Sequence, residues 1–213
     1  RHCRVHGVEH LEAARAAGRP VILLSPHVTG VEFGGLALTP YIAMATMANR
    51  LDDPVLQWVV HRARERHGPV WLREGGVRPV VRGLRRGFAF YYMPDEDHGP
   101  RNSTFAPFFG ADKATLTSLG RLAALSGAAV LPMMACHDPA TGRYEVELRA
   151  PLAGFPSGDA GADAAAMNAA LEQSIRRCPA QYLWNQRLFR TRPDGSRMAY
   201  PKRRRRHRRH RRR

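Results

Sequence analysis

Short apolar runs alternate with segments of helical length along most of this chain. Val21–Leu24 is a continuous apolar run that Ser25-Pro26 interrupts, and Val31–Leu38 follows it as a longer apolar segment. Runs of the first kind predict buried strands, and segments of the second kind predict helices. Their alternation is typical of α/β proteins, so we expect a mixed, largely parallel sheet flanked by helices.

The same patterns predict the remaining elements. Further strands are expected over residues 41–47, 69–72, 88–93, 129–134 and 144–149. Further helices are expected over residues 7–18, 55–66, 77–86, 115–126 and 163–177. Because 213 residues suffice for one core rather than two, residues 1–200 are expected to form one domain.

The helix expected over residues 55–66 has the clearest start signal. Asp53 is suited to cap its first turn, with Pro54 at the first helical position. Val55, Trp58 and Val59 recur at helical spacing. We therefore predict that these three side chains face the protein interior.

A histidine stands between the first buried strand and the helix that follows. His27 lies at the carboxyl end of that strand, where open α/β sheets usually keep their chemistry. A tight turn would bring Glu32 to the imidazole, where its carboxylate would fix the tautomer and stabilise the imidazolium. The pair is a candidate for removing a proton from a hydroxyl group. Thr29 and Glu32 also have the spacing of a helix capping box, which needs no catalysis.

A second polar cluster follows the strand expected over residues 88–93. Asp95 and Asp97 could be ligands of a hard cation, or solvated acids of a turn. Several arginines could line an anion pocket or only form a soluble face: Arg64, Arg82, Arg85, Arg86 and Arg101. The sequence contains no Walker loop, dinucleotide fingerprint or GxSxG elbow, which excludes several large enzyme classes.

The net charge of +16 is concentrated at the C-terminus. Residues 201–213 hold Lys202 and nine arginines, and removing these ten charges from +16 leaves +6 for the rest of the chain. So many like charges repel one another and bury nothing, so we expect a disordered tail. Beside an anionic membrane surface, such a tail would be attracted to the lipid headgroups.

The cysteines and the apolar runs indicate where in the cell the protein is expected. Cys3, Cys136 and Cys178 are odd in number and lack metal-binding spacing, so we expect reduced thiols in the cytosol. No apolar run reaches the roughly 18 to 20 residues of a membrane span.

Five groups of motif residues occur in order along residues 5–200. They are LSPH-x4-E ending at Glu32, Asn49-Arg50 with Asp53-Pro54 and Trp58, YMPDEDHGP at 92–100, FAPFFG at 105–110, and PAQYLW followed by RLFRTRP at 179–193. As an ordered set they resemble the bacterial lipid A secondary acyltransferases, the HtrB/LpxL/LpxM family of the lysophospholipid acyltransferase-like enzymes. The resemblance implies a glycerolphosphate acyltransferase-like fold.

The resemblance also implies an activity. Enzymes of this family act at the cytoplasmic face of the inner membrane and move a fatty acyl chain from acyl carrier protein, or from coenzyme A, to a hydroxyl of a lipid A precursor. By position, His27 would be the general base with Glu32 as its partner, and Arg64 and Asp95 would be further catalytic residues. The residues expected to bind substrate are Asn49, Arg50, Asp97, Arg101 and Arg187. No cofactor, metal or specific nucleic acid is implied.

The chain departs from the family pattern in two places. Family members normally begin with a hydrophobic membrane anchor, whereas this chain opens at Arg1 without one, so we expect a trimmed or incomplete chain. Asn185-Gln186 stand where the family usually has a histidine or arginine after the late tryptophan.

Three other functions remain open on the sequence. A related acyltransferase could use another lipid acceptor, such as a phosphatidylinositol mannoside or an ornithine lipid. A glycosyltransferase could use Asp95 and Asp97 to hold its metal. A nucleic-acid-binding protein would account for the basic tail but not for the polar clusters at two strand ends.

Overall fold

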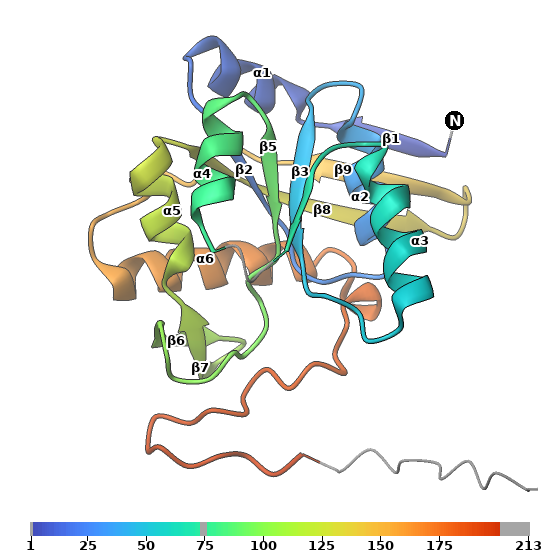
Figure 1. Ribbon diagram of the computed structural model, residues 1–213. Coiled ribbons are helices and arrows are strands. Elements are labelled where there is room, and N and C mark those ends of the chain that lie inside the picture. The colour runs from blue at the N-terminus through green and yellow to red at the C-terminus, as the bar shows by residue number, and fades with distance from the viewer. Residues whose placement is uncertain (1, 73–75, 201–213) are drawn as a thin grey trace, which may run out of the picture.

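The sheet predicted from the sequence is present. The computed structural model describes residues 2–72 and 76–200, so the disorder predicted for residues 201–213 lies outside the described residues. In the described part of the chain, seven strands form one sheet in the order β1-β9-β8-β2-β5-β3-β4 (Figure 1). Their bounds are β1 Cys3–His6, β2 Val21–Leu24, β3 Met44–Ala48, β4 Val70–Leu72, β5 Ala89–Tyr92, β8 Ala129–Asp138 and β9 Arg143–Leu148. Neighbouring strands run parallel except β8 and β9, which confirms a mixed, largely parallel sheet.

Helices flank this sheet as predicted (Figure 1). They are α1 Val8–Ala16, α2 Val31–Leu38, α3 Pro54–Glu65, α4 Arg78–Arg85, α5 Ser118–Ser126 and α6 Ala160–Ile175, followed by the short 3-10 helix η2 Pro179–Gln181. Within the residues described, no helix combines the length and apolar character needed to cross a bilayer.

Three strands were not predicted. The first is β1, which has an alternating pattern of only four residues. The other two, β6 Ser103–Phe108 and β7 Ala111–Leu116, form an antiparallel hairpin that lies below α6 in Figure 1. Because β7 takes residues 115 and 116, α5 begins three residues later than predicted.

The central strand β2 is buried on both faces and divides the core. Ile22 and Leu24 pack with residues of α4, α5 and α6, whereas Val21 and Leu23 pack with residues of α1 and α2. Side chains alternate across a strand, so four consecutive apolar residues serve both layers. This burial explains why the run of residues 21–24 is apolar without interruption.

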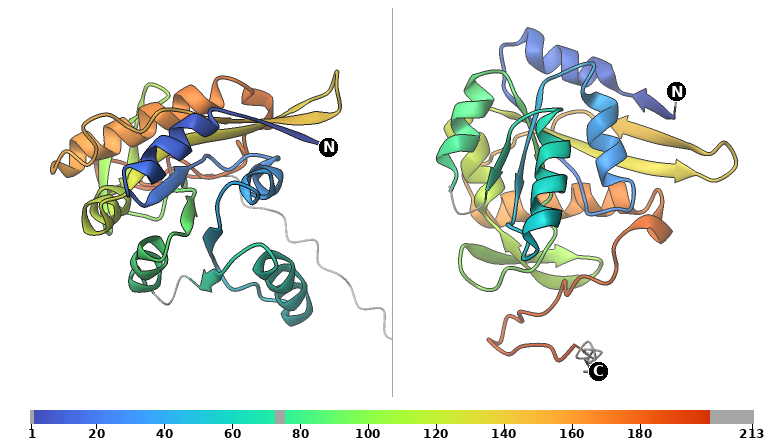
Figure 2. Two further views of the ribbon diagram at one scale, coloured as in Figure 1. Left: turned by 90° about the horizontal axis from the view of Figure 1, so that it is seen from above. Right: turned by 45° about the vertical axis from the view of Figure 1, so that its right-hand side comes forward.

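Helix α3 starts as predicted but packs differently. The Asp53 carboxylate accepts hydrogen bonds from the N–H groups of Val55 and Leu56, at 2.9 and 2.8 Å. The inward orientation predicted for Val55, Trp58 and Val59 is wrong, since their exposed fractions are 69%, 67% and 48%. The helix stands at the β4 edge of the sheet, apart from α6 (Figure 2), so its apolar stripe meets no second layer of described residues.

Candidate active site

His27 lies just beyond the carboxyl end of β2, beside the carboxyl end of β5. The two strands are parallel neighbours, with Leu24 opposite Tyr92, and the pairing continues through a bond of 3.0 Å from Ser25 N–H to the Tyr92 carbonyl. Both predicted polar clusters therefore meet at one edge of the sheet. This adjacency brings the loop after β5 against the His27 turn.

Asp95 of that loop is the carboxylate that holds His27. Its Oδ1 lies 2.5 Å from the Nδ1 of His27, and its Oδ2 accepts the His27 backbone N–H at 2.9 Å. Asp95 is completely buried, while the His27 side chain is 25% exposed. A neutral imidazole that donates its Nδ1 proton to Asp95 leaves Nε2 as the nitrogen with a free lone pair.

The charge around His27 favours a proton on the ring. Burial lowers the pKa of His27, but the hydrogen bond to Asp95 and the charges of Asp95 and Glu96 together outweigh burial, and the pKa lies above its ordinary value. The imidazolium that forms when His27 accepts a proton is thus stabilised by Asp95 and Glu96. This arrangement is that of a general base with an orienting carboxylate.

Tyr182 completes the surroundings of Asp95. Its hydroxyl donates to Asp95 Oδ2 at 3.0 Å. Burial and the nearby charge of Asp95 raise the pKa of the Tyr182 hydroxyl, so it remains a donor. Tyr182 reaches the site because residues 181–183 pair with residues 27–29, through bonds of 3.0 Å from Thr29 N–H to Gln181 and from Leu183 N–H to His27. No local pattern predicted this role of Tyr182, because residues 181–183 and 27–29 are far apart along the chain.

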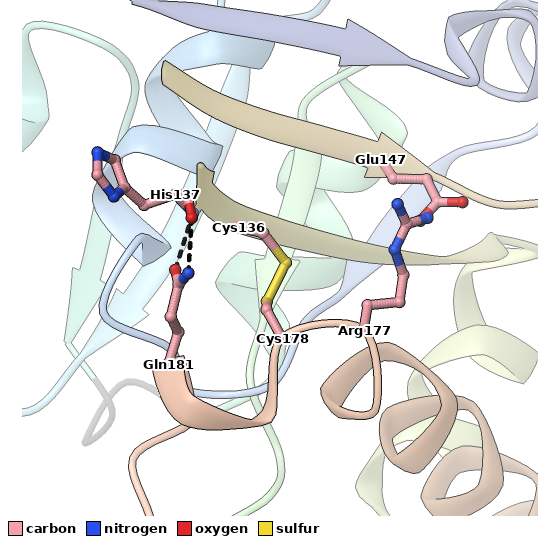
Figure 3. Close-up of a disulfide and its surroundings, with 6 residues drawn as sticks. All are labelled: Cys136, His137, Glu147, Arg177, Cys178 and Gln181. Carbon is pink, nitrogen blue, oxygen red and sulfur yellow. Dashed lines mark hydrogen bonds and ion pairs between the residues drawn. A yellow bond between two sulfur atoms is a disulfide. The ribbon is translucent and has the colours of Figure 1, made fainter. Parts of the chain in front are cut away.

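The segment that carries Tyr182 is fastened to β8 by several bonds (Figure 3). The Gln181 side chain pairs with the backbone of His137, accepting at 2.8 Å and donating at 2.7 Å. A disulfide joins Cys136 to Cys178, which corrects the expectation of three reduced thiols; Cys3 is free. Their separation of 42 residues gave no indication that the two sulfurs would meet.

Glu32 is placed differently from the prediction. The carboxylate at Nδ1 of His27 is Asp95 and not Glu32, which instead forms an ion pair with Arg64 of α3. The Glu32 side chain is 57% exposed and that of Arg64 is 35% exposed. The alternative interpretation of Thr29 and Glu32 as a capping box is contradicted, because Gly30 is the N-cap residue of α2 and no side chain among the described residues caps the helix. Glu32 lies on the first turn of α2 and lines the same cleft as His27.

An apolar cleft of about 500 Å³ opens beside His27. Its lining includes Met44, Met47 and Leu51, with His27, Glu32, Arg64 and Glu96 among its polar residues. A cleft of this kind suits a long apolar group whose reactive end lies near His27.

The five predicted substrate-binding residues do not gather in this cleft. Asn49 lines it, whereas Arg50, Arg101 and Arg187 are exposed outside its lining. Asp97 holds the C-terminal segment instead, because it accepts bonds from Thr191 N–H at 2.6 Å and from the Thr191 hydroxyl at 2.9 Å.

The contacts of Asp95 and Asp97 also bear on a metal site. Both carboxylates accept hydrogen bonds from the protein, and Asp95 is completely buried, so the alternative of solvated turn acids is wrong for Asp95. Within residues 2–72 and 76–200, no group of three or more His, Cys, Asp or Glu is arranged to hold a metal ion.

His27, which lines an apolar cleft, and the buried Asp95 behind it stand at the ends of adjacent parallel strands. They define an α/β protein whose site is suited to acid–base chemistry. The chain belongs to the bacterial lipid A biosynthesis acyltransferase family, whose model matches residues 1–191.

Known relatives extend this match over most of the chain. A lipid A biosynthesis acyltransferase of Haemophilus influenzae is 38% identical over 191 residues, covering 89% of this chain and 59% of the relative. The lipid A biosynthesis myristoyltransferase of Escherichia coli K12 is 33% identical, covering 91% and 61%. The lauroyltransferase of the same organism is 31% identical, covering 92% and 64%. The chain thus spans about three fifths of the length of these relatives.

Proposed function

We propose that this chain is the catalytic part of an enzyme that transfers a fatty acyl chain from a thioester to a hydroxyl of a lipid A precursor. The donor is acyl carrier protein or acyl-coenzyme A. The observation that carries the proposal is the His27–Asp95 pair beside an apolar cleft, in a chain of this family. The names of the relatives, which include a myristoyltransferase and a lauroyltransferase, support a fatty acyl chain as the transferred group.

The proposed reaction uses His27 twice. Its Nε2 removes the proton of the acceptor hydroxyl as that oxygen attacks the thioester carbonyl carbon. When the tetrahedral intermediate collapses, the carbon–sulfur bond breaks and the leaving sulfur takes the proton back from the imidazolium. Asp95 stabilises the imidazolium in between. The oxyanion would be stabilised by backbone N–H groups of the first turn of α2, which begins four residues after His27.

The Glu32–Arg64 pair is proposed to act at the mouth of the same cleft. Its position between α2 and α3 brings a guanidinium to a surface where the acceptor's phosphates would enter. Arginine binds phosphate through a planar set of donors, so Arg64 can pass from Glu32 to the acceptor. Asn49, at the cleft, and the exposed Arg50, Arg101 and Arg187 are proposed to contact the acceptor or the acidic carrier protein.

We propose that the protein acts at the cytoplasmic face of the inner membrane, and the exposed side of α3 supports contact with a membrane surface. Val55, Trp58 and Val59 form an apolar stripe that continues into Arg62 and Arg66, both exposed. Apolar side chains beside arginines are suited to the boundary between anionic headgroups and acyl chains. We propose that this stripe lies on the bilayer, so that the cleft faces its lipid substrate.

The proposal is tested by incubating the purified chain with acyl carrier protein thioester and a lipid A precursor, with and without EDTA. We expect an acylated product, identified by its mass, in both conditions. Absence of transfer from acyl carrier protein and from acyl-coenzyme A alike would contradict the proposal. Loss of transfer in EDTA would instead favour a metal-dependent reaction.

A further inference from the structure

The apolar cleft follows strand β3 from one edge of the sheet to the other. Every residue of β3 lines it, from Met44 to Ala48. Strands β2, β5 and β3 are parallel neighbours (Figure 1), so Ala48 lies at the same edge of the sheet as His27 and Met44 lies at the opposite edge. Because a strand advances about 3.3 Å per residue, Met44 and Ala48 are about 13 Å apart. The cleft therefore has one end at His27 and a far end at Met44.

The row of β3 side chains on the α2 side is small except at this far end. Met44 belongs to the same buried cluster as Leu38 of α2, and side chains alternate across a strand, so Thr46 and Ala48 share that side. Across from the row, Gly35 of α2 lines the cleft without a side chain. A Cβ atom at Gly35 would lie 3.9 Å from Cε of Met44, so the Met44 side chain extends to the space beside this glycine. Met44 is thus the large side chain of the row.

A loop between α3 and β4 bounds the cleft beside Met44. Residues 67–69 of this loop line the cleft, and the Pro69 carbonyl accepts the Thr46 N–H at 3.2 Å. A Cβ atom at Gly68 would collide with the carbonyl oxygen of Met44, so the loop backbone lies directly against that residue. Met44 itself is only 7% exposed. A side chain held between a helix and a loop in this way can stop a group that extends along the cleft.

We propose that Met44 limits the length of the fatty acyl chain that the enzyme transfers, an inference that rests on the proposed function. The thioester carbonyl lies at His27, the chain follows β3 past Ala48 and Thr46, and its methyl end stops at Met44. A staggered alkyl chain with C–C bonds of about 1.5 Å advances about 1.3 Å per carbon. The length of β3, about 13 Å, then accommodates about ten carbons. A chain close in length to lauroyl fits this space, whereas a palmitoyl chain would overpack it.

The first test measures kcat/KM for lauroyl and palmitoyl thioesters. The unaltered protein should prefer lauroyl. Met44→Ala should raise the ratio of palmitoyl to lauroyl transfer by at least about tenfold, because the space that the side chain leaves admits further methylenes. Thr46→Leu, which adds bulk nearer the reactive end, should shift the preference toward chains shorter than lauroyl. Met133→Ala is the matched control, because it truncates a methionine of the same buried cluster outside the lining of the cleft and should leave the ratio unchanged.

The second test needs neither activity nor a variant. Lauric acid with a diazirine at its methyl end is bound to the unaltered protein and activated by light, and the labelled peptides are identified by mass spectrometry. We expect labelling of Met44 or of residues 67–69. Lauric acid with the diazirine next to its carboxyl group should instead label residues at the other end, such as His27 or Asn49. This measurement remains available if Met44→Ala fails to fold.

The outcomes separate this inference from the proposed function. An unchanged ratio in folded Met44→Ala, or a methyl-end label found anywhere other than the Met44 end of the cleft, would overturn the role of Met44 while acyl transfer itself could stand. If the methyl-end probe labels the Met44 end but no thioester is transferred to the acceptor, the binding site for the chain stands and the proposed function fails.

Discussion

The floor and the outer wall of the cleft hold their carboxylates in opposite ways. The floor is His27, which lines the cleft, together with Asp95 and Tyr182, which lie buried behind it. There the carboxylate is completely buried and both of its oxygens are bonded. On the wall, formed by α2 and α3, Glu32 is 57% exposed and bound to Arg64. A buried carboxylate with three donors is fixed before substrate arrives, whereas an exposed ion pair contributes little to stability and can exchange partners. We therefore expect the floor to set the chemistry and the wall to receive the acceptor.

The largest effect is expected from removing the base itself. His27→Ala should lower kcat by about 10² to 10⁴, because the variant lacks the proposed base for the hydroxyl proton. Circular dichroism should show an unchanged fold. Retention of more than about a tenth of the activity in the folded variant would contradict the role of His27.

Asp95→Asn should lower kcat by about 10² and also change the pH dependence of stability. Since the pKa of His27 in the fold lies above 6.5, its protonated form stabilises the unaltered protein. That contribution is fully present below pH 6.5 and is lost as the pH rises through the folded pKa. In Asp95→Asn the hydrogen bond and charge that raise the pKa are gone, so this decline in denaturant midpoint above pH 6.5 should disappear. The same decline in both proteins would show that Asp95 does not set the state of His27.

On the wall, Glu32→Gln and Arg64→Met should each lower kcat/KM by at least about tenfold while changing the free energy of unfolding by less than about 1 kcal/mol. For Arg64→Met the loss should lie mainly in KM for the acceptor and should shrink at high salt, because screening weakens its phosphate contacts in the unaltered protein. If both variants have the same kinetic constants as the unaltered protein at every salt concentration, the Glu32–Arg64 ion pair has no role in acyl transfer.

The smallest effect on the fold is expected on the outer side of α3. Trp58→Ser combined with Val59→Ser should weaken binding to vesicles of anionic phospholipid by about tenfold, since two apolar side chains no longer enter the bilayer. The free energy of unfolding should change by less than about 0.5 kcal/mol. Leu125→Ser on α5, where the side chain is 57% exposed, is the control that should leave binding unchanged. Equal sedimentation of the unaltered protein and both variants with vesicles would contradict the proposed contact between α3 and the membrane.

The sequence predicted the elements well because their signals are local. The apolar run of β2, the Asp53–Pro54 start of α3 and the glycine after α5 each depend on a few adjacent residues. The motif set indicated the family, and strand-end positions indicated His27 and Asp95 as site residues. The hairpin of β6 and β7 was not predicted, because turn-forming residues interrupt both strands. Their strand character is evident only from the antiparallel pairing between them.

What only the tertiary structure decided is which distant groups meet. Glu32 was the obvious partner for His27 by spacing, but the adjacency of β2 and β5 delivers Asp95, which is 68 residues away from His27 in sequence. The contact of Tyr182 with Asp95 and the joining of Cys136 to Cys178 depend likewise on segments that the fold brings together. The apolar stripe of α3 has a helical period whether or not anything covers it, and its exposure follows from its place at the sheet edge. Periodicity records which side chains share a face, whereas strand order and packing determine what that face meets.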